Sequence, residues 1–165
     1  MKKEILILLV FLVSFPGMNA QIGFPEKCLG IWEGNMKIYS NGTLKDSVDV
    51  RLTVSKAPES EVFGWKTEYL STKYPVVKDY KMKSFHKESN QYIVDEGDGI
   101  ELYEYQFEKK LYSVFETSGL LLTSSYELTD DKLIFEVTSG VKIETDKEVI
   151  NYSVKNLQRV IFKRK

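Results

Sequence analysis

The sequence predicts an all-β protein, an antiparallel up-and-down barrel of about ten strands. Three observations favour this fold class. Segments in which apolar and polar residues alternate recur along the chain, as in residues 44–55, and this alternation is typical of half-buried strands. The connections between these segments are short and rich in Gly, Asn, Asp and Ser, the residues of turns. No segment keeps apolar residues at helical spacing for several turns.

The N-terminus has the pattern of a secretory signal peptide. Lys2 and Lys3 precede an apolar run over residues 5–15, and small residues lead to Ala20. The run is shorter than the about 20 apolar residues of a membrane-spanning helix, although a retained membrane anchor is the alternative. We expect residues 1–20 to be a signal peptide and residues 21–165 a single barrel domain that does not span a membrane. The protein is then secreted or periplasmic, and residues 21–27 are a loose lead-in.

The first two strands are predicted to form a hairpin. Between residues 44 and 55 the even positions are mostly apolar and the odd positions polar, and the preceding segment, 32–39, also alternates. Asn41 and Gly42 lie between the two segments, and both residue types adopt the positive φ angles that a tight hairpin needs.

The remaining strands follow at hairpin spacing. We expect them at residues 61–70, 76–85, 91–95, 100–107, 110–117, 120–128, 132–139 and 148–162. Such a meander avoids an exposed edge by closing, so that the long last strand pairs with the first. A flat sandwich of two sheets is the alternative.

Composition excludes several classes of function. The chain has 23 Lys and Arg against 24 Asp and Glu, and it contains one His and one Cys. Without a basic excess it lacks the charge with which nucleic-acid-binding proteins neutralise phosphates. A single Cys and a single His leave neither a disulfide framework nor a common zinc motif. We therefore expect no nucleic-acid partner and no metal site.

The residues offer no recognisable catalytic constellation. His86 and Cys28 are each single and far apart in sequence, and the acidic segment 95–99 lacks the ligand spacing of a calcium loop, which favours a hairpin turn. Carboxylates on neighbouring predicted strands, chiefly Glu104 and Glu116, are the remaining catalytic candidates. The sequence therefore predicts a protein that is not an enzyme.

One short motif points to a family. The first predicted strand opens with Gly30, Trp32 and Gly34 in the order Gly-x-Trp-x-Gly, and here the chain resembles the calycin superfamily, in its lipocalin-like and nitrobindin-like forms. The resemblance implies a lipocalin-like barrel in which Trp32 closes one end and a cation from the last strand, Arg159, packs on the ring. A helical lid is absent from the predicted elements. Haem, which nitrobindin-like barrels bind through a late His, is not expected, because no His follows His86, and no other cofactor is indicated.

The resemblance implies a protein that holds a small hydrophobic ligand inside the barrel. Strand parity nominates five lining residues, Met36, Trp65, Met82, Phe115 and Tyr126. Each of these could instead be a core residue, because a small barrel can fill its own interior. The alternative function is a filled barrel that acts as an interaction or accessory module of the cell envelope, through an exposed patch of Tyr103, Tyr105 and Tyr112. The ligand and the oligomeric state do not follow from the residues.

Overall fold

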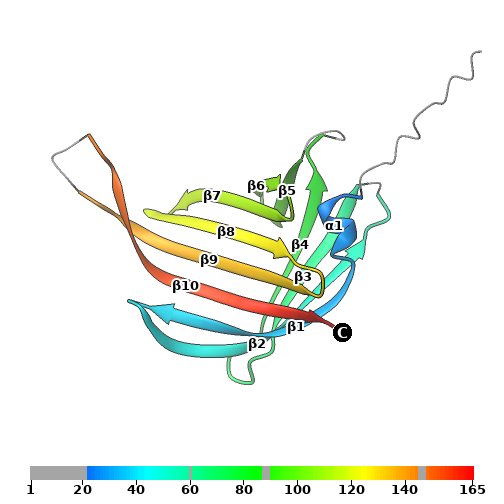
Figure 1. The fold of residues 1–165 in the computed structure, drawn as a ribbon, viewed down its shortest axis with the longest axis horizontal. Coiled ribbons are helices and arrows are strands. Elements are labelled where there is room, and N and C mark those ends of the chain that lie inside the picture. Colours follow the sequence, from blue (N-terminus) through cyan, green and yellow to red (C-terminus); the bar gives the residue numbers. More distant parts are fainter. Residues whose placement is uncertain (1–21, 60, 87–89, 145–147) are drawn as a thin grey trace, which may run out of the picture.

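The chain folds into a closed antiparallel barrel (Figure 1). A computed structural model describes residues 22–59, 61–86, 90–144 and 148–165, so that the predicted signal peptide lies outside the described residues. The described part holds one short helix, α1 (Phe24–Lys27), and ten strands. The strands are β1 (Gly30–Ser40), β2 (Thr43–Lys56), β3 (Val62–Tyr69), β4 (Val76–Ser84), β5 (Gln91–Gly97), β6 (Ile100–Phe107), β7 (Lys110–Thr117), β8 (Leu120–Leu128), β9 (Lys132–Ile143) and β10 (Asn151–Arg164). The predicted fold class is confirmed.

Pairing of the last strand with the first closes the barrel. Trp32 of β1 lies opposite Arg164 of β10, and Ser40 lies opposite Asn156. Every other strand pairs with its neighbours in sequence, as in an up-and-down meander. The structure is therefore a barrel and not the sandwich that the sequence left as an alternative.

The first hairpin forms as its residues predict. Asn41 and Gly42 both have positive φ angles, 50° and 73°, and connect β1 to β2. On β2 the alternate residues Val50, Leu52 and Val54 are buried in the core. The acidic segment 95–99 covers the end of β5 and the two-residue turn to β6, where Asp98 and Gly99 have positive φ.

The ends of β9 and β10 differ from the prediction. β9 continues past Ser139 to Ile143, where it pairs with the beginning of β10, and Figure 1 shows this part of the hairpin reaching beyond the other strands. Gly140 interrupts the apolar alternation in the sequence, which is why the prediction stops there. In the structure the glycine lets β10 pass closely, because a Cβ atom would overlap the carbonyl oxygen of Ser153.

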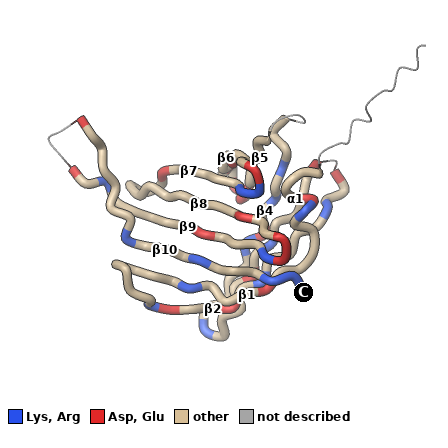
Figure 2. Tube along the Cα trace, viewed as in Figure 1, with Lys and Arg blue, Asp and Glu red and all other residues tan. Residues whose placement is uncertain are grey.

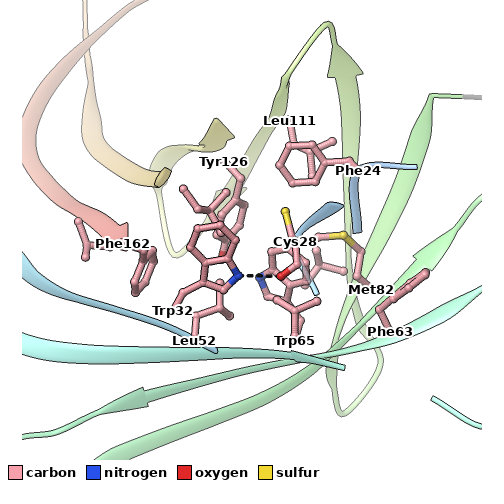
Figure 3. Close-up of a cluster of buried hydrophobic side chains, with 14 of the residues drawn as sticks. Phe24, Cys28, Trp32, Leu52, Phe63, Trp65, Met82, Leu111, Tyr126 and Phe162 are labelled. Carbon is pink, nitrogen blue, oxygen red and sulfur yellow. Dashed lines mark hydrogen bonds between the residues drawn. The ribbon is translucent and has the colours of Figure 1, made fainter. Parts of the chain in front are cut away.

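One end of the barrel is closed by the segment that the sequence predicts as a loose lead-in. Phe24 of α1 is 1% exposed and belongs to the main hydrophobic cluster (Figure 3). Its backbone N–H donates to the Tyr92 hydroxyl at 3.1 Å. Residues 24–27 are therefore a helical plug, and the expectation of a loose segment is wrong because one aromatic side chain anchors it in the core.

The tryptophan of the motif lies at this closed end. Trp32 is 1% exposed, and its indole N–H donates to the Cys28 carbonyl oxygen at 2.7 Å (Figure 3). The cation on the ring is Arg164, whose Cζ lies 4.2 Å from the ring centroid. Arg159, which the sequence proposed for this place, lies on the outside and pairs with Glu136 at 3.3 Å. The correction follows from strand parity, since Arg164 shares the inner face of β10 with Phe162 and Arg159 does not.

The sheet is loosely joined on one side. β4 pairs with β5 only from Lys81 to Ser84, and β6 pairs with β7 only from Tyr105 to Phe107. The first residues of β4 and the last residues of β7 thus lack partners on the side of the β5–β6 hairpin. The barrel is tightly packed at the end that holds α1 and opens where these strands separate.

Candidate functional site

The barrel encloses a cavity of about 290 Å³. Eight of the ten strands, β3 to β10, contribute side chains to its wall. The lining residues are Trp65, Thr67, Tyr69, Lys78, Tyr80, Val94, Glu96, Leu102, Glu104, Phe115, Leu122, Ser124, Tyr126, Phe135, Val137 and Gln158. A wider hollow of about 740 Å³ lies beside the β6–β7 and β8–β9 turns, but none of the residues that line it is buried. The interior cavity is therefore the candidate site.

Aromatic rings form one wall of the cavity. The rings of Trp65 and Tyr126 meet edge to face, with centroids 5.2 Å apart, and Tyr126 stacks on Phe135 at 4.4 Å. Burial raises the pKa of the Tyr126 hydroxyl well above its usual range, so this hydroxyl stays protonated. The wall is thus largely apolar, with the Tyr126 hydroxyl as a polar group within it.

Three of the five residues that the sequence nominated line this cavity, namely Trp65, Phe115 and Tyr126. The other two, Met36 and Met82, are fully buried in the hydrophobic core and are not part of the cavity wall. Parity places a side chain inside the barrel, but it does not distinguish the packed end from the hollow one.

A buried carboxyl group is the most unusual feature of the cavity. Glu104 of β6 is 3% exposed, and its Oε2 atom has no hydrogen-bond partner among the described residues. Burial raises the pKa of this carboxyl from 4.5 to about 8, because the charged form is poorly solvated there. Near neutral pH Glu104 is therefore mostly an uncharged acid, which can donate a hydrogen bond as well as accept one.

A second buried polar atom is also without a partner. The indole Nε1 of Trp65, 1% exposed, makes no hydrogen bond of normal geometry among the residues that the structure describes, although it lies close enough to the Tyr126 hydroxyl to lower the pKa of that group somewhat. By contrast, the inward Gln106, next to Glu104 on the same face of β6, accepts from the Tyr92 hydroxyl at 3.3 Å and donates to the Glu108 carbonyl oxygen at 2.7 Å. Unpartnered buried polar atoms are uncommon in folded proteins, and here two of them belong to residues that line one cavity.

The orientation of β6 explains why Glu104 is inside. Its even positions, Leu102, Glu104 and Gln106, face the interior, while the aromatic Tyr103, Tyr105 and Phe107 are exposed outside. This is the reverse of the usual pattern, in which the larger apolar side chains face the core. The sequence analysis grouped Glu104 with Glu116 as carboxylates of adjacent strands, but Glu116 is exposed. The only hint in the sequence that Glu104 is unusual was that it lies between aromatic residues at the odd positions of β6. The sequence does not show that these aromatic residues face outward and Glu104 inward; the tertiary structure does.

Charged groups lie toward the loosely joined side. Tyr80 of β4 and Glu96 of β5 line the cavity together with Lys78. Burial, with Glu96 nearby, raises the pKa of Tyr80 to about 12. The Lys78 ammonium lies 5.7 Å from the centroid of the Tyr80 ring. The cavity thus has an uncharged inner part and a charged rim.

The remaining sequence candidates lie elsewhere. Cys28 is buried at the closed end, and burial raises the pKa of its thiol to about 12. His86 lies just after β4, exposed, with its ring 4.3 Å from that of Phe85. Among the described residues no group of three or more His, Cys, Asp or Glu side chains is arranged to hold a metal ion. Tyr103, Tyr105 and Tyr112 are about half exposed on the outer face of β6 and β7.

The charged side chains show no strong segregation. Figure 2 shows both signs distributed over the strands and turns of the barrel. Within the described ranges, no helix has the length and apolar character needed to cross a bilayer.

The comparisons with known proteins support the fold. No family model matches the chain, and no curated protein sequence does. Among solved structures, the chain is similar to the S-type phycobiliprotein lyase CPES from Guillardia theta, with a TM-score of 0.63 over 88% of this chain and 94% of the other at 9% identity. The likeness is one of fold. It supports a closed antiparallel barrel, while the resemblance to the calycin superfamily and its Gly-x-Trp-x-Gly motif stay predictions.

Two mutants of the fluorescent protein UnaG also overlap with the barrel. Their identities are 15% and 19%, their TM-scores 0.49 and 0.45, and the overlaps cover 84% and 85% of this chain and 96% and 97% of the others. These overlaps are too loose to carry an argument.

The comparison contradicts the expectation that the protein is not an enzyme. The similar barrel from Guillardia theta is that of a protein described as a lyase. The expectation rested on the absence of a catalytic motif, and a local motif does not report side chains that separate strands bring together. Glu104 and Trp65, 39 positions apart in the sequence, illustrate this, since both line one cavity.

Proposed function

We propose that this protein is an exported barrel that binds a small, predominantly apolar ligand in its interior cavity. The observation that carries the proposal is a cavity with an aromatic wall and a buried, unpartnered carboxyl group, Glu104. Leaving a buried polar atom without a partner costs about 1–3 kcal/mol. A ligand that fills the cavity and reaches this group would offset that cost, which a plain structural core would avoid by placing an apolar residue there.

The size and lining of the cavity support a small ligand. A volume of about 290 Å³ is just below the range of about 300–1,000 Å³ for small-molecule sites, so that a small ligand suits it. Phe115, Leu122, Phe135 and Val137 present apolar surface, and a few polar groups stand among them. This is the composition typical of a site that takes up most of a ligand's surface and orients it through few hydrogen bonds.

The experiment is displacement of a hydrophobic fluorescent probe, such as ANS, by lipid extract, together with native mass spectrometry of the purified protein. Val137 lines the cavity and Val114 of β7 is 65% exposed on the outside, so that Val137→Phe and Val114→Phe make the same change in two environments. We expect Val137→Phe to weaken probe binding about tenfold or more and Val114→Phe to leave it unchanged. Absence of probe binding and of any retained ligand in the wild-type protein would overturn the proposal.

Export is supported by the signal-peptide pattern of residues 1–20. The test is the mass of the mature protein recovered from the medium or the periplasm of the producing cell. We expect a chain that begins at Gln21. Recovery of the protein only from the cytoplasm, with residues 1–20 intact, would contradict export.

The outer surface favours a second candidate function, interaction with a protein of the cell envelope. Tyr103, Tyr105, Phe107 and Tyr112 are about half exposed or more on adjoining strands, and aromatic side chains are enriched at protein interfaces. The sequence analysis described this alternative as a barrel with a filled interior, whereas the barrel has an interior cavity. This role is therefore supported by the surface alone. A pull-down from envelope fractions with wild-type protein and Tyr105→Ser tests it. The same protein captured by the wild type and lost with the variant would support the role, and no capture would contradict it.

A further inference from the structure

The inner part of the cavity holds one buried group that can only donate a hydrogen bond. The indole N–H of Trp65 can only donate, and it makes no hydrogen bond of normal geometry among the described residues, although it lies close enough to the Tyr126 hydroxyl to lower the pKa of that group somewhat. The buried Tyr126 is held in its protonated form, and Ser124 contributes a second hydroxyl to the same wall. Which chemical group of a ligand fits beside these residues therefore depends on the protonation state of Glu104.

Among the described residues, no positive charge faces Glu104 from the elements around it. The titratable side chains that line the cavity are Tyr69 of β3, Lys78 and Tyr80 of β4, Glu96 of β5 and Tyr126 of β8, and Tyr92 lies opposite Glu104 on β5. Strands β7, β9 and β10 contribute only uncharged residues to the cavity wall. Lys78, the one cation among the lining residues, lies at the rim beside Tyr80 and is exposed. Burial without a countercharge favours the protonated carboxyl, in line with the pKa of about 8.

A protonated Glu104 adds one more donor to a site that already has an unpartnered donor. A ligand with an amine or another donor at its buried end would leave the Trp65 N–H unmet, and an ionised carboxylate would bring an unpaired charge into the cavity. A carbonyl oxygen suits the site better because it is uncharged and has two lone pairs with which it can accept from two donors.

We propose that the ligand is a neutral molecule with an apolar body and a carbonyl oxygen at its buried end, which accepts hydrogen bonds from Glu104 and Trp65. The apolar body then lies against Phe115, Leu122 and Phe135, toward the loosely joined side of the barrel. This inference rests on the proposed function, because it assigns a chemical class to the ligand of the same cavity.

The test compares four compounds of equal chain length as competitors of the fluorescent probe: methyl nonyl ketone, undecane, undecylamine and undecanoate. At neutral pH we expect the ketone to displace the probe at a concentration about five to ten times lower than undecane does. This is the gain in affinity expected from one or two net hydrogen bonds. The amine and the carboxylate should compete less well than the ketone. The preference for the ketone over undecane should decrease as the pH rises through about 8, since the carboxyl then loses its proton.

Two variants identify the groups. Trp65→Phe removes the donor and keeps a ring, and we expect it to reduce the preference for the ketone about fivefold without a comparable change for undecane. Glu104→Gln keeps a neutral donor, so it should retain the preference and lose its pH dependence. Tyr105→Phe on the outside of the same strand, 51% exposed, is the control that should change neither. Urea unfolding of each variant verifies that it is folded.

The outcomes separate this inference from the proposed function. Probe binding with equal displacement by ketone and undecane, or with a preference for undecylamine that Glu104→Gln abolishes, would overturn the carbonyl assignment and leave ligand binding intact. Failure of all four compounds and of lipid extract to displace a probe, or failure of the probe to bind, would overturn both. A ketone preference that is unchanged in Trp65→Phe would overturn the role of Trp65.

Discussion

The Arg164 guanidinium lies over the ring of Trp32, with its Cζ 4.2 Å from the ring centroid. Its two terminal nitrogens donate to the carbonyl oxygens of Leu29 and Lys27, the latter at 2.9 Å. One side chain from the last strand therefore fastens the first strand and the end of α1. The closed end of the barrel depends on this contact between residues 132 positions apart in sequence.

Replacing this arginine should destabilise the barrel. We expect Arg164→Ala to lower the free energy of unfolding by about 2 kcal/mol, because it removes a cation–π contact and hydrogen bonds from a charged donor. Arg159→Ala, which removes an exposed ion pair with Glu136, should cost at most about 1 kcal/mol. Urea unfolding of both variants measures the difference. An equal or larger cost for Arg159→Ala would contradict the assignment of Arg164.

Gly34 of the motif is needed for close packing of β1 on β10. A Cβ atom at this position would lie 2.6 Å from the Ile161 carbonyl oxygen and 2.7 Å from Val160 Cγ2. Because backbone must shift to relieve this overlap, we expect Gly34→Ala to cost about 2–3 kcal/mol in urea unfolding.

Gly64→Ala is the matched control for Gly34→Ala. Its Cβ would meet the Ser55 hydroxyl oxygen at 2.7 Å, which can rotate away, so the cost should stay below about 1 kcal/mol. Equal effects of the two substitutions would show that loss of glycine, and not the approach of β10, decides stability.

The buried carboxyl should make stability depend on pH. Since the pKa of Glu104 is about 8 in the folded protein and 4.5 for an exposed glutamate, the folded state binds the proton more tightly. The stability due to this difference is full below about pH 4.5 and is lost as the pH rises through about 8. Relative to Glu104→Gln, the wild type should lose on the order of 4 kcal/mol between pH 5 and 9.

Urea unfolding across this pH range is the measurement, and Glu101→Gln is its control. Glu101 is on the same strand, but it is exposed, so this variant should keep the pH dependence of the wild type. Parallel pH profiles for the wild type and Glu104→Gln would show that Glu104 does not titrate in this way.

Cys28 should be unreactive while the protein is folded. The thiol is buried, and burial raises its pKa to about 12, so that little of the reactive thiolate forms at pH 8. We expect Ellman's reagent to leave the folded protein unmodified and to label one thiol per chain in urea, since the chain has a single Cys. Rapid labelling of the folded protein would mean that the closed end opens readily.

Much of the fold was predictable because strands are local. Alternation over residues 44–55 and the Asn41–Gly42 turn identify a hairpin without reference to the rest of the chain, and β2 and the turn form as expected. The ends of β9 and β10 were less accurate because the pairing between distant segments sets them. The lead-in was misjudged for the same reason, since the helix at Phe24 is anchored in a core that other segments build.

The site was predictable only in part. Parity nominated Trp65, Phe115 and Tyr126, which line the cavity, but it also nominated Met36 and Met82, which lie in the packed core. The pattern of β6 allows either face to be inside, because aromatic residues alternate with polar ones. Burial of Glu104, the group on which the proposed function depends, is a property of the assembled barrel.

The sequence by itself determined the strand order and most of the turns, because hydrophobic alternation and positive-φ residues act over a few neighbouring positions. It favoured closure of the meander, but the pairing of β1 with β10 in the structure excluded the sandwich. Tertiary structure alone decided which arginine lies on Trp32, which end of the barrel is packed and which is hollow, and that Glu104 is buried without a partner. The reason is physical: register, burial and the resulting shift in the pKa of Glu104 arise from contacts between strands that are distant in the chain.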